Sequence, residues 1–191
     1  MKPKSIIFLL VLLLNLYSCA QDKNPKNKEH SHEVVVTDLD IPWGFTFLPD
    51  NSILITEKSG KLIQYKAGKK NTISGLPDVI VLGQGGFMDI ELHPNYKETG
   101  WIYFSYASSE DDDEDTANTK IMSAKLKNNA LVAKHVLYKA SPDSGRGQHF
   151  GSRIEFDNEG FLFFSVGDRG NRDVNPQDIT IDCGKIYRLH D

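Results

Sequence analysis

The stretch Ile154-Glu-Phe-Asp-Asn-Glu-Gly-Phe-Leu-Phe-Phe-Ser165 places a polar turn, Asp157–Gly160, between two short apolar runs. The runs are typical of strands, and Asp, Asn and Gly tolerate the backbone dihedrals of tight turns. The same order of strand, turn and strand recurs at residues 45–56 and at residues 90–105. The sequence therefore predicts a β-hairpin at each of these places.

A further extended run follows the first and the last of these hairpins. Residues 60–65 (Gly-Lys-Leu-Ile-Gln-Tyr) match residues 184–189 (Gly-Lys-Ile-Tyr-Arg-Leu), and each would add a third strand to its hairpin. Repeats of about 40 to 60 residues with several short strands are typical of propeller blades. We therefore expect an all-β protein, a β-propeller, of which this chain holds about two and a half to three blades.

That number of blades is too small to close a ring, since propellers have at least about four. The sequence also ends at Leu189-His190-Asp191, directly after the third strand of a blade. We expect residues 33–191 to be a partial propeller that is truncated at its C-terminus. The alternative is a half-propeller that closes as a homodimer.

Composition limits the possible functions. The chain has 191 residues, of which 39% are hydrophobic and 25% charged, as in an ordinary globular domain. Its formal net charge is -4, and no run of Lys and Arg alternates with aromatic residues. A partner such as nucleic acid, whose phosphates need a basic surface, is therefore not expected.

Residues 1–19 differ from the rest of the chain. Two lysines precede an apolar run at residues 6–14, which is too short to span a bilayer and predicts an export signal. The signal ends in Leu16-Tyr-Ser-Cys19, which resembles a bacterial lipobox, so we expect Cys19 to be lipidated. The alternative is a plain signal peptide with an incidental cysteine. An exported protein of the cell envelope is predicted, periplasmic or on the outer surface, held to the membrane only by its lipid.

Residues 20–32 are polar and aperiodic, which predicts a flexible tether. If Cys19 is lipidated, Cys183 is the only thiol of the mature chain, and no intramolecular disulfide can form. The acidic run at residues 110–115 lacks the spaced ligands of a calcium loop, and we interpret it as a solvated loop.

Glycine-rich clusters lie at the predicted strand ends, at residues 83–86, 145–153 and 167–173. His149 precedes the first strand of its hairpin and Asp168 follows the second, so antiparallel pairing should bring the two side chains together. A histidine beside a carboxylate is suited to be a general base, because the acid fixes the tautomer and stabilises the imidazolium. A structural hydrogen bond that closes the hairpin is an equally good interpretation at this point.

These clusters also carry a family resemblance, which extends over the whole mature domain. The order of the motifs resembles the N-terminal half of the soluble glucose, aldose and sorbosone dehydrogenases that depend on pyrroloquinoline quinone (PQQ). The motifs are Pro42-Trp-Gly44, Gly83-Gln-Gly-Gly86, Glu91-Leu-His-Pro94, His149-Phe-Gly-Ser-Arg153, Gly167-Asp-Arg-Gly170 and Gly184-Lys-Ile186.

The resemblance implies a six-bladed propeller with PQQ at its central face and Ca²⁺ polarising the quinone. It implies that His149 contacts the cofactor and accepts the proton of an aldose's anomeric hydroxyl while hydride passes to the quinone. It also implies that Asp168 orients His149 and that Gln84 contacts the sugar. An external acceptor would then take the electrons.

Some expected positions depart from the family pattern or are missing. A second glutamine of some members falls on Asp173, with Gln177 nearby, and its role is left unassigned. The family's ligands for Ca²⁺ and for the cofactor carboxylates lie in later blades, so no metal ligand is expected in this chain, which should be inactive alone. The alternatives are a surface-anchored propeller that only binds, and a calcium propeller hydrolase of the lactonase type.

Overall fold

The computed structural model describes residues 31–111 and 113–190. The predictions for residues 1–19, for Cys19 and for most of the tether lie outside the described residues. The chain divides into two compact units, Met1–Val35 and Val36–Asp191. In the first unit, the described residues 31–35 are exposed and form no helix or strand. Everything below concerns the second unit.

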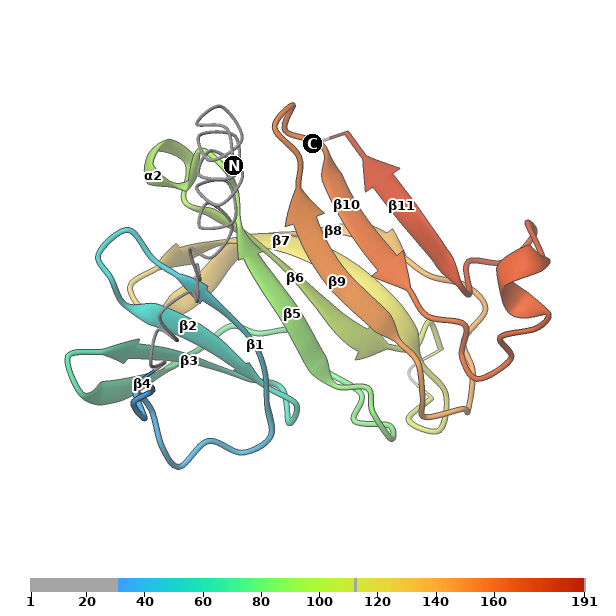
Figure 1. Cartoon of the computed structure of the whole chain (residues 1–191), viewed down its shortest axis with the longest axis horizontal. Helices are drawn as coiled ribbons and strands as arrows, with labels where there is room; N and C mark the ends of the chain where they lie inside the picture. Colours follow the sequence, from blue (N-terminus) through green and yellow to red (C-terminus); the bar gives the residue numbers. More distant parts are fainter. Residues whose placement is uncertain (1–30, 112, 191) are drawn as a thin grey trace, which may run out of the picture. The chain divides into compact units, whose positions relative to one another are not determined.

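The second unit consists of three antiparallel sheets, which follow one another in chain order across Figure 1. The sheets have the strand orders β1-β2-β3-β4, β5-β6-β7-β8 and β9-β10-β11. The strands are β1 (Pro42–Phe47), β2 (Ile53–Glu57), β3 (Lys61–Lys66), β4 (Lys69–Ile73), β5 (Phe87–Leu92), β6 (Trp101–Ser108), β7 (Asn118–Lys127), β8 (Ala130–Lys139), β9 (Gly151–Phe156), β10 (Leu162–Val166) and β11 (Lys185–Leu189). A short helix, α2 (Tyr96–Thr99), joins β5 to β6, and a 3-10 turn, η2 (Asn175–Gln177), precedes β11.

The three predicted hairpins are confirmed, as are the predicted third strands β3 and β11. Equivalent residues pair in each hairpin: Phe45 with Ile55, Ile90 with Phe104, and Ile154 with Phe164. Sheets of four, four and three strands agree with the expected two and a half to three blades.

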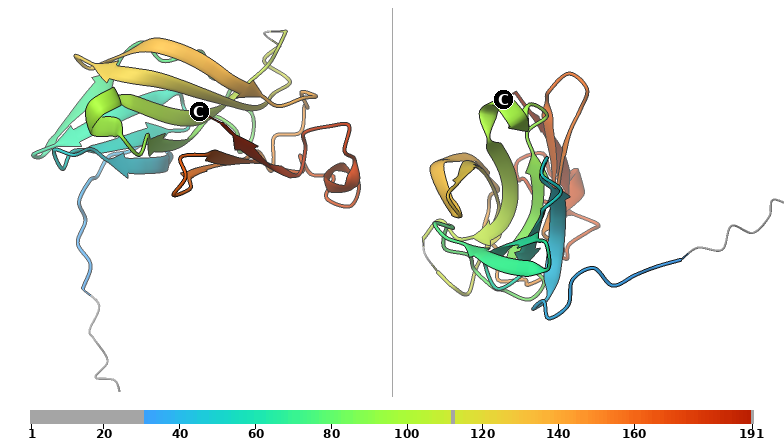
Figure 2. Two further views of the ribbon diagram at one scale, coloured as in Figure 1. Left: turned by 90° about the horizontal axis from the view of Figure 1, so that it is seen from above. Right: turned by 90° about the vertical axis from the view of Figure 1, so that its left-hand side faces the viewer.

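Strands β5, β6 and β7 of the middle sheet are buried on both faces, because their alternating side chains contribute to two cores. Along β6, Ile102 and Phe104 pack toward the first sheet, whereas Tyr103 packs toward the third. Figure 2 shows the strong twist of this sheet. The first core includes Leu54, Leu62, Phe87, Ile90, Ile102 and Phe104, and the second includes Tyr103, Ile121, Ile154, Leu162 and Phe164.

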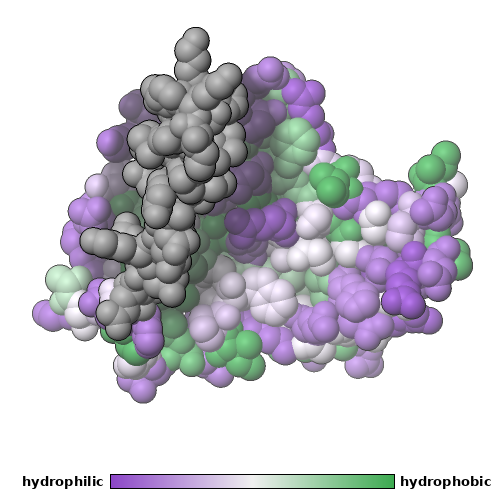
Figure 3. Space-filling model, in the orientation of Figure 1, coloured by the Kyte–Doolittle hydropathy of each residue, from purple (hydrophilic) through white to green (hydrophobic). Residues whose placement is uncertain are grey.

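The outer sheets each leave apolar side chains exposed. Trp43, Phe45 and Phe47 alternate along one face of β1 and are exposed, and Ile186 is exposed on β11. Figure 3 shows hydrophobic patches between the hydrophilic residues on the face drawn in Figure 1. In the middle sheet, such exposed apolar side chains lie on the edge strand β8, at Val132 and Val136.

The first strand of each sheet has a register shift near its beginning. The shifts lie between Pro42 and Phe45 in β1, between Phe87 and Ile90 in β5, and between Gly151 and Ile154 in β9. Each is a β-bulge, in which two residues of this strand lie opposite one residue of its partner, and bulges turn side chains out of the regular alternation. The three bulges lie at the same end of their hairpins, where the glycine-rich loops enter.

A hydroxyl at the same position of each second strand secures these bulges. Ser105 Oγ accepts the backbone N–H of Asp89 at 3.0 Å and donates to the carbonyl of Ser152, in the next sheet, at 2.9 Å. Thr56 makes the equivalent pair of bonds between the first and second sheets. These buried bonds hold neighbouring sheets in one register beside the loops that form the candidate site.

Candidate functional site

The three predicted glycine-rich loops are in direct contact at the bulged ends of the hairpins. Gln84 N–H donates to the carbonyl of Gly147 at 2.6 Å, and Gly167 N–H donates to the carbonyl of Phe150 at 3.0 Å. A Cβ on Gly167 would lie 1.8 Å from the oxygen of His149, which no side chain could tolerate. Glycine is therefore required here because two backbones meet.

His149 and Asp168 are neighbours, as the hairpin geometry predicts. Nδ1 of His149 lies 2.7 Å from Oδ1 of Asp168. The same oxygen accepts the N–H of Gly170 at 2.7 Å. The hydrogen bond with His149 holds the pKa of the Asp168 carboxyl below its usual value, against the effect of burial and with help from the Gly170 N–H.

An ionised Asp168 determines which nitrogen of His149 carries the proton. The carboxylate accepts a hydrogen from Nδ1, so the neutral ring keeps its lone pair on Nε2. The side chain of His149 is 49% exposed, and no described residue forms a hydrogen bond with Nε2. The pair thus exposes the basic Nε2 of His149 to solvent at the bulged ends of the hairpins, and the carboxylate of Asp168 orients the ring.

Gln84, the third predicted site residue, also lies beside His149. Its Oε1 accepts the backbone N–H of His149 at 2.9 Å, and its amide NH₂ has no partner among the residues that the structure describes. The amide group can therefore donate to a ligand next to the imidazole. The structure thus brings Gln84, His149 and Asp168 together, while their roles stay predictions.

The backbone at this site is strained. His149, Ser152 and Arg169 have φ angles of 54°, 89° and 56°, in the left-handed region that disfavours side chains. Each such residue costs about 1–3 kcal/mol and persists only where its surroundings hold it. Ser152 lies in the bulge of β9, and His149 and Arg169 lie in the two loops that meet at the site.

Sequence reasoning assigned no role to Arg169, yet this residue lies deepest in the site. It is 1% exposed, and its burial lowers the pKa of the guanidinium to about 10, so that it is charged at neutral pH. Nη2 donates to the carbonyl of Ala117 at 3.3 Å, and the guanidinium also bonds the carbonyls of Gln148 and Arg146. Its only signal in the sequence is its place directly after Asp168 in the glycine-rich cluster.

The remaining candidates lie away from this site. Asp173 is exposed beside Arg172, and Gln177 ends the turn η2. Cys183 is a free, buried thiol. The described part of the chain holds no group of three or more His, Cys, Asp or Glu side chains that could bind a metal ion. Nor do residues 31–111 and 113–190 contain a helix that is long and apolar enough to cross a membrane.

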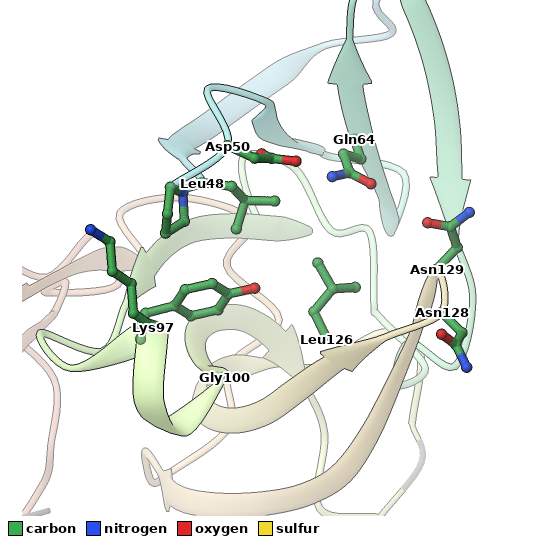
Figure 4. Close-up of a pocket in the computed structure, with 10 residues that line it drawn as sticks. Leu48, Asp50, Gln64, Lys97, Gly100, Leu126, Asn128 and Asn129 are labelled. Atoms are coloured by element: carbon green, nitrogen blue, oxygen red, sulfur yellow. The ribbon is translucent and has the colours of Figure 1, made fainter.

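A separate hollow of about 550 Å³ lies at the opposite ends of the strands. Figure 4 shows Leu48 and Leu126 pointing toward each other across it, with Asp50, Gln64 and Asn129 around it. None of the three predicted site residues lines this hollow. Its open form and partly apolar lining do not suggest catalytic chemistry, so the pair of His149 and Asp168 remains the candidate site.

The sequence and the fold were compared with those of known proteins. The family model for glucose/sorbosone dehydrogenases matches residues 39–191. The aldose sugar dehydrogenase YliI of Escherichia coli is 37% identical over 164 residues, which cover 83% of this chain and 43% of that protein. The chain thus spans less than half the length of this curated relative.

Solved structures agree. The soluble aldose sugar dehydrogenase of Escherichia coli, in its apo form, superimposes with a TM-score of 0.74 at 36% identity, over 79% of this chain and 44% of that one. The PQQ-bound aldose sugar dehydrogenase of Streptomyces coelicolor gives a TM-score of 0.73 at 24% identity, over 84% of this chain and 47% of that one. The latter shows the fold alone.

The blade-like sheets and their matches define part of a β-propeller, which confirms the predicted fold class. The chain belongs to the glucose/sorbosone dehydrogenase family, which confirms the resemblance drawn from its motifs.

Proposed function

We propose that the protein, with a segment equivalent to the rest of its relatives, oxidises an aldose at the anomeric carbon to the lactone. One observation carries this proposal: an imidazole whose Nδ1 is bonded to Asp168 at 2.7 Å while its Nε2 is unpartnered among the described residues. Family membership supports the choice of a sugar as substrate.

In this proposal His149 Nε2 accepts the proton of the anomeric hydroxyl. Asp168 stabilises the imidazolium that forms, because a carboxylate at hydrogen-bond distance favours the charged ring. Gln84 donates its free amide N–H to a sugar hydroxyl, next to the reacting carbon. Its Oε1 meanwhile keeps the backbone of His149 in place.

We also propose PQQ as the cofactor, which when bound accepts the hydride from the anomeric carbon. Two observations support a fit: the exposed face of His149 lies beside a free amide, and a solved relative of the same fold is described as PQQ-bound. His149 is the only residue of this chain that we assign to contact the cofactor. Ca²⁺ belongs to the proposal as well, but the described residues offer no ligand group for it.

The remaining parts of the proposal concern the surroundings of the enzyme. We propose an exported protein that is anchored through lipid on Cys19 and passes its electrons to an external acceptor. Support for these points comes only from the sequence of the first nineteen residues and from the family resemblance.

The test is His149→Ala in the full-length protein, with PQQ and Ca²⁺ added and aldose-dependent dye reduction as the readout. Loss of a general base lowers the rate by about 10²–10⁴-fold. His135→Ala is the matched control, because His135 lies on β8 of the middle sheet and contacts Trp101 rather than the site. A rate in His149→Ala equal to that of the control would remove His149 from the role of base.

A further inference from the structure

The residues that directly follow the three site residues lie together in a buried layer beneath the site. Gln84, His149 and Asp168 are followed in the sequence by Gly85, Phe150 and Arg169. Phe150 and Arg169 are 3% and 1% exposed, whereas His149 is half exposed. In each loop, a residue of the candidate site is thus followed by a buried residue.

The inner layer is held together through the ring of Phe150. A Cβ on Gly85 would lie 2.4 Å from Cζ of Phe150, so the ring tip rests on the backbone of the first loop. The guanidinium carbon of Arg169 lies 3.5 Å from the ring centre, in a cation–π contact. Through this ring, all three loops that carry the site residues are in contact below the site.

The guanidinium of Arg169 bonds the loop that leads into His149, together with the segment before β7. Its acceptors are the carbonyls of Gln148, Arg146 and Ala117. These carbonyl dipoles and the ring of Phe150 compensate its buried charge at short range, and the carboxylates of Asp143 and Asp168 add a longer-range attraction. The backbone N–H of Arg169 also points to the carbonyl of His149, at 3.4 Å.

This arrangement explains how the strained backbone of His149 is maintained. A left-handed φ of 54° relaxes unless bonds on both sides of the residue hold it. Gln84 holds the N–H of His149, and Arg169 holds the carbonyls of Gln148 and of His149 itself. The side chain of His149 reaches Asp168 only while this backbone conformation lasts.

We propose that Gly85, Phe150 and Arg169 form a clamp beneath the site, in which Arg169 is the positioning residue that holds His149 against Asp168. The proposal rests on the proposed function for its effect on sugar oxidation, but the contact of His149 with Asp168 can be measured independently. Lysine cannot replace Arg169 in this clamp. Its single ammonium group lacks the planar fork that reaches several carbonyls while stacking on a ring.

The test is Arg169→Lys in the full-length protein, since this change keeps the positive charge near Asp168 and removes the fork. The first readout is the titration of the Asp168 carboxyl, followed by NMR. Its midpoint should rise toward the ordinary value as the bond from His149 is lost, and kcat for sugar oxidation should fall about 10–100-fold, as for loss of other positioning partners. Arg172→Lys is the matched control, because Arg172 is exposed on the same loop, and it should change neither quantity.

A second variant, Phe150→Leu, removes the ring contact with little loss of apolar volume and should change both readouts in the same direction by a smaller amount. It also covers the case in which Arg169→Lys does not fold. An unchanged Asp168 titration and kcat in a folded variant would overturn the clamp. If the titration shifts while the wild-type protein oxidises no sugar, the clamp stands and the proposed function fails.

Discussion

The two ends of the third hairpin use the same turn chemistry for different purposes. At the closed end, Asp157 Oδ1 accepts the N–H of Glu159 at 2.9 Å, and at the open end Asp168 Oδ1 accepts the N–H of Gly170 at 2.7 Å. Both are aspartates that bond the backbone two residues ahead. Only Asp168 also reaches a side chain of another loop, the ring of His149. The same turn-forming carboxylate therefore takes part in the candidate site only where it also bonds a side chain of another loop.

The backbones of the two ends differ as well. At the closed end, a Cβ on Gly160 would meet nothing within 4 Å, although its φ is 87°. At the open end, a Cβ on Gly167 would collide with the backbone of His149. Glycine serves a turn at one end and the contact between two loops at the other. Substitutions at the open end should therefore have larger effects on stability than those at the closed end, and they should also affect activity.

The largest difference is expected between Gly167→Ala and Gly160→Ala. The first should lower the free energy of unfolding by about 3 kcal/mol or more, because two backbones must separate. The second should cost about 1–2 kcal/mol, the ordinary cost of a left-handed alanine. Denaturant unfolding of both variants measures the difference. Equal losses of stability would show that the loops do not meet as closely as the comparison requires.

The closed ends could be predicted from the sequence, whereas the open ends could be predicted only in part. Turn residues such as those of Asp157–Gly160 identify hairpins, and hairpin geometry alone placed His149 beside Asp168. The bulges were missed, because an extra residue in a strand leaves no mark in a short apolar pattern. Arg169 was missed for another reason. Its acceptors are backbone carbonyls, which every residue type provides, so no partner residue appears in the sequence.

A smaller effect separates Asp168→Asn from Asp157→Asn in the full-length protein. The first should lower kcat for sugar oxidation about 10–100-fold, because an amide can still accept the Gly170 N–H but no longer stabilises a charged His149. The second changes a bond within its own turn and should leave kcat unchanged. Steady-state kinetics of both variants provide the measurement. If the two substitutions reduce kcat equally, Asp168 has no role beyond that of a turn residue.

The smallest expected effect is on the pH dependence of stability, and it compares Asp168 with Asp50 of the closed end of the first hairpin. The bond with His149 lowers the pKa of Asp168, and bonds from Lys66 and Ser52 hold the pKa of Asp50 well below its usual range. A carboxyl whose pKa is lower in the folded than in the unfolded state contributes stability above the unfolded value of about 4, and this contribution is lost as the pH falls through the folded pKa.

Stability measured from pH 7 down to pH 2 should therefore show a gap between wild type and Asp168→Asn that narrows below about pH 4. Asp50→Asn should behave likewise, but because the side chain of Asp50 is itself 44% exposed, the gap at pH 7 should shrink in high salt. The side chain of Asp168 is only 21% exposed, so its gap in stability should shrink less in high salt than that of Asp50. The same salt sensitivity for both gaps would mean that the open end protects its carboxylate no better than a surface turn does.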